Sequence, residues 1–368
     1  RNCVCTRNPA CERQPASPGG QKEIIRMNTQ TSVADAVLVP NAPALPGLVF
    51  RRFRGDADFP QMTRVLAAAE AADGNERVVT LDEIRNNYAH LTDTDPARDI
   101  LMAEVDGQLV AYGRVESWRE DSGARLYNHF AFLDPAWRRR GLGGAMLKWF
   151  QNRLREIAAA HPDDGPRFFQ SFASDKAAGT EAMLQRDGYS AVRYFYQMVR
   201  PDLENIPDFP LPEGVEVRPV LPEHYRAIWE ANVEAFRDHW GFAEPTENDY
   251  EGWLKDPTIF TPELWQIAWD TATNQVAGQV KGFINPHENE RFNRQRGYTE
   301  FISVRRPWRK RGLARALIVR TLRVFKERGQ TESALGVDTE NLSGALRVYE
   351  DCGFRPVQRN ATYRKPLT

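Results

Sequence analysis

The sequence predicts a mixed α/β fold in which one arrangement of strands and helices occurs twice. Strand-like alternation and helical periodicity follow each other in the same order in both halves of the 368-residue chain. Two short motifs also recur at a nearly constant spacing. Because the length suffices for two domains of roughly 150 residues each, we expect a duplicated domain.

The predicted elements follow from local periodicity between turn residues. In the first half, alternation predicts strands near 49–53, 100–105, 108–117, 124–133, 167–174 and 189–200. Helical spacing in this half is carried by Leu147, Phe150, Leu154 and Ile157. In the second half, strands are expected at 215–220, 264–269, 276–284, 298–304, 334–337 and 354–363. Helices are expected at 223–240, from 312 onward and at 344–351.

The repeated motifs align the two halves. Residues 137–141 read Trp-Arg-Arg-Arg-Gly, and residues 308–312 read Trp-Arg-Lys-Arg-Gly, 171 positions later (308 minus 137). The pairs Gly188-Tyr189 and Gly353-Phe354 lie 165 positions apart (353 minus 188). The expected organisation is a disordered lead-in over 1–47, domains at 48–200 and 214–368, and a proline-rich linker at 201–213.

Composition excludes several classes of protein. Lys plus Arg is 49 and Asp plus Glu is 50, and this balance argues against a dedicated nucleic-acid binder. No run of about 18 apolar residues occurs, so we expect no membrane span. Three of the four cysteines are Cys3, Cys5 and Cys11, and Cys352 stands alone. This distribution favours a cytoplasmic protein without a disulfide framework, and no fourth ligand completes a zinc site.

The repeated loop has the chemistry of a diphosphate site. Each copy reads Arg-x-x-Gly-x-Gly or Ala and precedes a helix, with Gly141 and Gly143 in the first copy and Gly312 and Ala314 in the second. Small residues let backbone N–H groups approach an anion at a helix N-terminus. The P-loop pattern is absent, and Met146 occupies the third glycine position of a dinucleotide fingerprint. A solvated basic helix start is the alternative, which the repetition disfavours.

These residues resemble a known family. Arg138–Gly143 and Arg309–Ala314 resemble the acyl-CoA pyrophosphate loop of the GNAT superfamily of N-acyltransferases, and Asn341, Ala345, Tyr349 and Gly353-Phe354 resemble its second landmark. The tandem arrangement is similar to that of mycothiol synthase relatives, in which the second copy is the catalytic one. The resemblance implies a mostly antiparallel, splayed sheet with flanking helices, and acetyl-CoA as co-substrate without a metal.

The resemblance also assigns residues to the co-substrate. The pantetheine arm would lie between the parting strands and contact the backbone of Ile302 and Val304, with Asn341 on the far side. The pyrophosphate would lie on the loop Arg309, Lys310, Arg311, Gly312, Leu313 and Ala314. Arg138, Gly141 and Gly143 are the corresponding residues of the first copy.

Acyl transfer to an amine needs a base, and the departing thiolate benefits from a proton. Tyr349 occupies the family's general-acid position, and a phenol with a pKa near 10 is protonated at neutral pH. Glu300 is the expected base; it shares a strand face with Ile302 only if the strand is regular, and a bulge would turn it over. Asp238 and His239 are reserve candidates and, with Trp240, are expected to line the acceptor cleft at the end of the first long helix.

The first copy departs from this pattern. Leu184 stands where the second copy has Tyr349, and counting back from the basic loop places His129 where the second copy has Glu300. We therefore expect a catalytically degenerate first domain that binds CoA weakly or is structural.

The sequence predicts an N-acetyltransferase that moves an acetyl group from acetyl-CoA to a primary amine of a small molecule or peptide through a tetrahedral intermediate. The alternative is a non-catalytic acyl-CoA-binding or interaction protein. No nucleic-acid or membrane partner is expected, and the oligomeric state is open.

Overall fold

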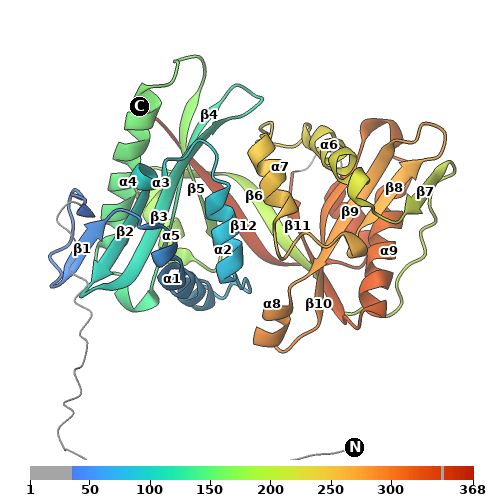
Figure 1. The fold of residues 1–368 in the computed structure, drawn as a ribbon, viewed down its shortest axis with the longest axis horizontal. Helices are drawn as coiled ribbons and strands as arrows, with labels where there is room; N and C mark the ends of the chain where they lie inside the picture. Colours follow the sequence, from blue (N-terminus) through green and yellow to red (C-terminus); the bar gives the residue numbers. More distant parts are fainter. Residues whose placement is uncertain (1–34, 341–343) are drawn as a thin grey trace, which may run out of the picture.

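The computed structural model describes residues 35–340 and 344–368. One continuous twelve-stranded sheet runs through both halves, in the order β1-β2-β3-β4-β5-β12-β6-β11-β10-β9-β8-β7. Figure 1 shows the two lobes joined where β12 and β6 pass between them.

The elements of the first half follow the predicted order. Its strands are β1 (Leu48–Arg51), β2 (Ile100–Val105), β3 (Gln108–Arg119), β4 (Arg125–Leu133), β5 (Arg167–Ser174) and β6 (Ser190–Arg200). Its helices are α1 (Phe59–Ala72), α2 (Leu81–Ala89), α3 (Pro96–Asp99), α4 (Leu142–Ala159) and α5 (Ala178–Arg186).

The second half follows this order with two differences: a short 3-10 turn stands in place of α3, and a short helix, α8, lies between two strands. Its strands are β7 (Val215–Arg218), β8 (Gln266–Asp270), β9 (Val276–Ile284), β10 (Arg296–Val304), β11 (Glu332–Asp338) and β12 (Arg355–Pro366). Its helices are α6 (Tyr225–Phe236), α7 (Glu247–Leu254), α8 (Pro286–Arg291), α9 (Leu313–Glu327) and α10 (Ala345–Asp351).

The last strand of each half pairs with the other half. β12 lies between β5 and β6, and β6 pairs on its other edge with β11 of the second half. Three strand pairings therefore cross the sequence-based division at 201–213: β5 with β12, β12 with β6, and β6 with β11. Because main-chain hydrogen bonds run unbroken from lobe to lobe, each half depends on the other to complete its sheet.

Helices cover both faces of each half. In the first, α4 packs on the core that contains Leu147, Phe150 and Leu154, and α1 packs on the opposite face. In the second, α9 and α10 cover one face, and α6 and α7 cover the other with an aromatic cluster around Trp253. These layers confirm the mixed α/β prediction.

The central strands of each half separate partway along their length. The parallel pairing of β10 with β11 ends at Tyr298 opposite Ala334. The pairing of β4 with β5 ends at Asn128 opposite Gln170. Each pair therefore opens a cleft beyond these residues, as the expected splay between 298–304 and 334–337 requires.

A β-bulge distinguishes the two clefts. The pairing of β10 with β9 shifts register between Glu300 and Ser303, and Phe301 has φ of 50°. The pairing of β3 with β4 has no such shift. The extra residue on β10 makes Phe130, and not His129, the counterpart of Glu300 by register. Counting residues back from the basic loop failed because the bulge places one extra residue of β10 between Glu300 and the loop.

Three expectations outside the clefts need correction. Residues 35–47, expected to be disordered, pack on the first half: Val39 is buried, and the Val37 N–H donates to the Phe50 carbonyl at 2.8 Å. The linker does not run free, because its Leu203 is buried in the second core. The long helix expected over 223–240 ends at Phe236, before Asp238.

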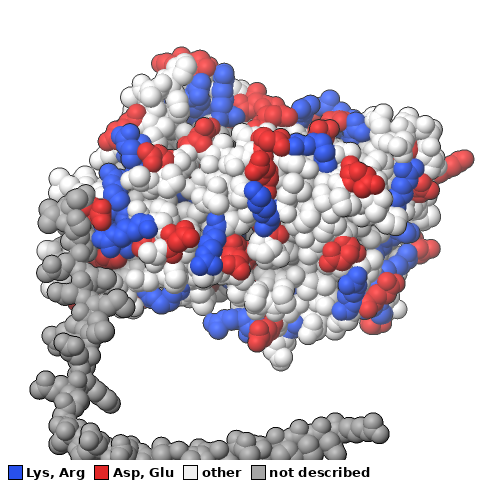
Figure 2. Space-filling view, viewed as in Figure 1, with Lys and Arg blue, Asp and Glu red and all other residues white. Residues whose placement is uncertain are grey.

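The surface agrees with the near-neutral composition. In Figure 2, blue and red side chains alternate over the visible face without a large area of one sign. Among the described residues, no helix combines the length and apolarity needed to cross a bilayer.

Candidate active site

The cleft between β10 and β11 opens into a cavity of about 1920 Å³ that reaches both halves. Glu300, Ile302 and Tyr349 all line it, together with Gly336 from β11. The structure thus brings the two expected catalytic side chains into one cavity, from a strand and from α10.

Glu300 is held at the point where the strands part. Its carboxylate accepts a hydrogen bond from the Gly336 N–H at 2.8 Å, which takes the place of a strand-to-strand bond. Burial raises the pKa of Glu300 to about 8, and the Gly336 N–H opposes part of this rise. The bulge does not take Glu300 out of the cavity. A carboxylate with this pKa is a far better base than an ordinary glutamate.

The raised pKa predicts a stability effect of Glu300→Gln. The native glutamate keeps its proton up to about pH 8, whereas the unfolded chain loses it near 4.5. Glu300 therefore favours the unfolded state increasingly between pH 4.5 and 8. Relative to the parent chain, the unfolding temperature of Glu300→Gln should rise across this window and be unchanged below it. The same calorimetric scan on Glu290→Gln, at an exposed position of α8, is the control; an equal rise there would contradict the assignment.

Tyr349 is suited to give a proton. It lies on α10 with a relative exposure of 7%, between the second core and the cavity. Burial raises the pKa of Tyr349, and the nearby Glu300 charge raises it further. The phenol therefore stays protonated across the physiological range.

The two basic loops have the same backbone conformation. Lys310 and Arg139 have φ of 61° and 62°, and Gly312 and Gly141 have φ of 84° and 88°. Each glycine immediately precedes the first helical residue, Leu313 in α9 or Leu142 in α4. Positive φ at the glycine turns the backbone so that the first N–H groups of the helix face outward.

Most of the basic side chains around the second loop are engaged with the protein. Asp238 binds both Arg306 and Arg309, and Arg309 also donates to the Val304 carbonyl at 2.9 Å. Arg311 donates to the Glu213 carbonyl at 2.8 Å. Exposed Lys310 has no ion pair within the described ranges, so it is the side chain best placed to meet a phosphate.

The reserve candidates separate in space. Hydrogen bonds from Arg306 and Arg309 lower the pKa of Asp238, so this carboxylate is a poor base. His239 lines the cavity, and burial lowers its pKa. Trp240 stacks under Arg364, whose guanidinium carbon lies 4.3 Å from the ring centroid. Asn341 lies outside the described residues.

The first half contains no equivalent catalytic pair. His129 is buried, and its Nε2 lies 2.8 Å from the Tyr189 hydroxyl. Burial lowers the pKa of His129 to about 4. Leu184 is fully buried at the position matching Tyr349. Arg138, Gly141 and Gly143 nevertheless line the same large cavity, and Arg138 forms an ion pair with Asp73 at 2.6 Å.

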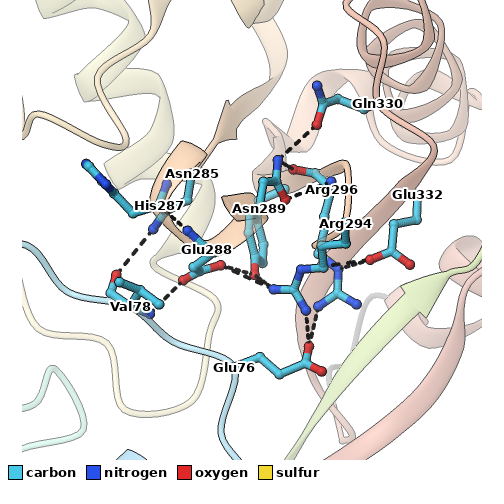
Figure 3. Close-up of polar contacts among 11 residues, drawn as sticks. Glu76, Val78, Asn285, His287, Glu288, Asn289, Arg294, Arg296, Gln330 and Glu332 are labelled. Atoms are coloured by element: carbon cyan, nitrogen blue, oxygen red, sulfur yellow. Dashed lines mark hydrogen bonds and ion pairs between the residues drawn. The ribbon is translucent and has the colours of Figure 1, made fainter. Parts of the chain in front are cut away.

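The first half also supplies one wall of the cavity, which includes Glu76 and Val78. Figure 3 shows the polar contacts of these two residues with the second half. Glu76 binds Arg294 and Arg296, and the Val78 N–H donates to Glu288 at the start of α8 at 3.2 Å. Burial alone would raise the pKa of Glu76, but the two arginines outweigh it and lower that pKa. Sequence reasoning missed this wall because no local pattern predicts contacts between segments more than 200 residues apart.

The described residues form no metal centre at the cavity. In the parts of the chain that the structure describes, no three His, Cys, Asp or Glu side chains gather as a metal site would require. Cys3, Cys5 and Cys11 lie outside the described residues, and Cys352 is buried with its thiol unpaired.

Both halves of the chain match one known protein family. The model of the acetyltransferase (GNAT) family matches residues 63–162 and 225–354. The chain belongs to the GNAT acetyltransferase family. Each match contains its own basic loop, so the duplication is a tandem repeat of the GNAT fold. The chain is an acyl-CoA-dependent N-acetyltransferase.

Relatives of known name match over most of this chain. It is 27% identical to a mycothiol acetyltransferase of Thermomonospora curvata over 314 residues, covering 83% of this chain and 94% of the relative. It is 28% identical to a mycothiol acetyltransferase of Salinispora arenicola over 312 residues, covering 84% and 94%.

Solved structures agree with the fold. A GCN5-related N-acetyltransferase from Sphaerobacter thermophilus has a TM-score of 0.66 at 26% identity, covering 90% of this chain and 97% of that one. A tandem GNAT protein from the clavulanic acid biosynthesis pathway has a TM-score of 0.63 at 15% identity, covering 87% and 99%. The second likeness bears on the fold alone.

Proposed function

We propose that this enzyme transfers the acetyl group of acetyl-CoA to a primary amine in the cleft between β10 and β11. The observation that carries the proposal is the meeting of Glu300 and Tyr349 in one cavity, where burial makes Glu300 a stronger base and keeps the Tyr349 phenol protonated by raising the pKa of each. The glycine-bearing loop at the start of α9 supports the donor assignment, because its N–H groups suit a diphosphate.

The proposed chemistry is direct attack. The amine nitrogen bonds to the thioester carbon, and Glu300 accepts the proton that the nitrogen loses. The tetrahedral intermediate then collapses, the carbon–sulfur bond breaks, and Tyr349 gives its proton to the leaving thiolate. Transfer of the proton on Glu300 back to Tyr349, directly or through water, restores both groups. The products are an amide and the CoA thiol.

The lining of the cavity supports a polar acceptor. Residues with carboxamide side chains line it from several strands and loops, among them Asn75, Gln197, Asn285 and Gln358. Phe283 and Tyr298 stack at 4.9 Å beside them and offer an apolar surface. With mycothiol acetyltransferases among the relatives, we propose a mycothiol-related acceptor, such as a cysteinyl glycoside with a free amine, as the first to assay.

Gly312→Ala tests the donor loop. Gly312 has φ of 84°, and a Cβ there would meet no atom within 4 Å, so the substitution acts through backbone strain and not through a clash. A left-handed conformation costs an L-residue about 1–2 kcal/mol. The dissociation constant for acetyl-CoA, measured by titration calorimetry, should rise about tenfold. Gly141→Ala in the first loop is the control; it has the same positive φ, although its Cβ would also come 3.3 Å from the Pro43 Cβ, and it should leave turnover unchanged. Equal losses in turnover would contradict the division of roles.

Release of CoA thiol in the presence of an amine panel tests the function as a whole. The panel contains cysteinyl glycosides, simple glycosylamines and peptides with free N-termini. We expect thiol and N-acetyl product in equal amounts with at least one cysteinyl glycoside. Tight binding of acetyl-CoA with no turnover on any amine would favour the non-catalytic binding protein instead.

A further inference from the structure

The bulge in β10 is what sets the active cleft apart from the inactive one. Its extra residue carries Phe301 at φ of 50°, a conformation that an aromatic residue rarely adopts. The matching strand β4 is regular, and it has no residue with positive φ. Something in the second half must therefore favour the strained conformation of Phe301.

Lys281 lies directly behind the bulge. It is on β9, opposite Glu300 in register, and is 2% exposed. Its ammonium nitrogen lies 4.7 Å from the centroid of the Phe301 ring and 4.7 Å from that of Trp253. The bulge turns the Phe301 ring toward this ammonium, whereas a regular strand would direct the two side chains to opposite faces.

The surroundings of this ammonium are unusual for a buried cation. Within the described ranges, no carboxylate lies within 4.0 Å of it, and its nearest recorded partners are aromatic faces. Burial lowers the pKa of Lys281 to about 7, while aromatic faces attract the charged form. Of the rings around this ammonium, Trp253 and Trp265 belong to the core and Phe301 belongs to the bulge, so the attraction to Phe301 acts on the bulge.

The first half provides an internal comparison. By register, the counterpart of Lys281 is Arg114, which lies opposite Phe130. Arg114 also stacks on an aromatic ring, 5.0 Å from the Phe130 centroid, but Glu116 binds it at 2.7 Å. Here the phenylalanine faces the cation from a regular strand, and the carboxylate neutralises the charge. In the second half, Phe283 stands at the position of Glu116, so no carboxylate pairs with Lys281 from there. The Phe301 ring meets the Lys281 ammonium only because the bulge turns it to that face.

We propose that Lys281 is a positioning residue, whose contact with Phe301 holds the bulge that presents Glu300 and the backbone of Ile302 to the acyl group. Lys281 does not line the cavity and touches no substrate in this proposal. It acts through the strand: the bulge ends the regular pairing at Glu300, lets its carboxylate reach the Gly336 N–H, and leaves the following backbone facing the cleft. The proposal rests on acetyl transfer at this cleft, as proposed above.

A double-mutant cycle between Lys281 and Phe301 tests this contact. Lys281→Met keeps the length and apolar stem of the side chain and removes its charge. We expect kcat to fall at least tenfold and the dissociation constant for acetyl-CoA to rise, with the folded state retained by circular dichroism. In the Phe301→Gly background, where glycine adopts positive φ without strain, the same Lys281→Met change should cost less than twofold.

The controls separate the possible failures. Arg114→Met, the matched change in the first half, should leave kcat and the acetyl-CoA affinity unchanged. Three outcomes would overturn the proposal. Lys281→Met could lower kcat equally in both backgrounds, or it could lower kcat in neither. Arg114→Met could lower kcat by a similar factor. Should Lys281→Met not fold, Phe301→Leu replaces it, since removing the ring while keeping the lysine must lower kcat as well. If the unaltered chain transfers no acetyl group, the proposed function fails; the acetyl-CoA affinities still test the contact.

Discussion

Tyr349→Phe is expected to lower kcat about 10²- to 10³-fold, because the departing thiolate then leaves without a proton from the enzyme. The substitution removes one oxygen from a side chain that is 7% exposed, so the packing of α10 is preserved. The KM for acetyl-CoA should change little, since Tyr349 acts on the leaving group. Steady-state assays of thiol release measure both parameters.

The first half offers a matched control at the same position of its own motif. Leu184 is fully buried, so Leu184→Met, which conserves volume, is preferable to a truncation that would leave a cavity. Activity should remain within about twofold of the parent chain, as expected for a distant apolar substitution of small energetic effect. A loss of turnover in Leu184→Met with none in Tyr349→Phe would move the active centre to the first half.

The second large effect concerns Glu300 and pH. Because its pKa is raised to about 8, Glu300 is mostly protonated at pH 7 and becomes a competent base only as the pH rises through 8. We expect kcat/KM to increase tenfold per pH unit well below 8 and to level off above it. Glu300→Gln should lower kcat about 10²- to 10⁴-fold and remove this ionisation from the profile.

The ionisation of the acceptor must be separated from that of Glu300. An amine with a pKa near 6 is neutral throughout the range of interest, so the remaining pH dependence belongs to the enzyme. If the profile for such an amine is flat between pH 6 and 9, Glu300 is not the base. A profile that shifts with the pKa of each amine tested, and not with the Glu300→Gln change, would lead to the same conclusion.

Sequence reasoning predicted the parts of the fold that local pattern specifies. Alternation and helical spacing located the strands and helices, and the basic loop predicted the helix start near Gly312 that the structure shows as α9. The pairing of β6 and β12 with strands of the other half was not predicted. Both strands carry the alternation that either position in the sheet would require. Only the pairing of residues far apart in the chain decides between the two.

The sequence predicted those residues of the candidate site that belong to a motif. It missed the residues whose position depends on packing between distant segments. Tyr349 and Glu300 follow from the motif and the strand, and both line the cavity. The bulge at Phe301 has no signature in the sequence, since phenylalanine does not favour positive φ. Consequently His129 was matched with Glu300 by counting, although register matches it with Thr299. Lys281 was overlooked because a lysine in a strand is usually exposed.

The most direct measurement is the position of acetyl-CoA in a crystal of this protein. We expect the thioester in the cleft between β10 and β11, with its sulfur within hydrogen-bond distance of the Tyr349 hydroxyl and its carbonyl carbon facing the Glu300 side of the cavity. An acetyl group that instead occupies only the cleft between β4 and β5, beside His129, would contradict the account.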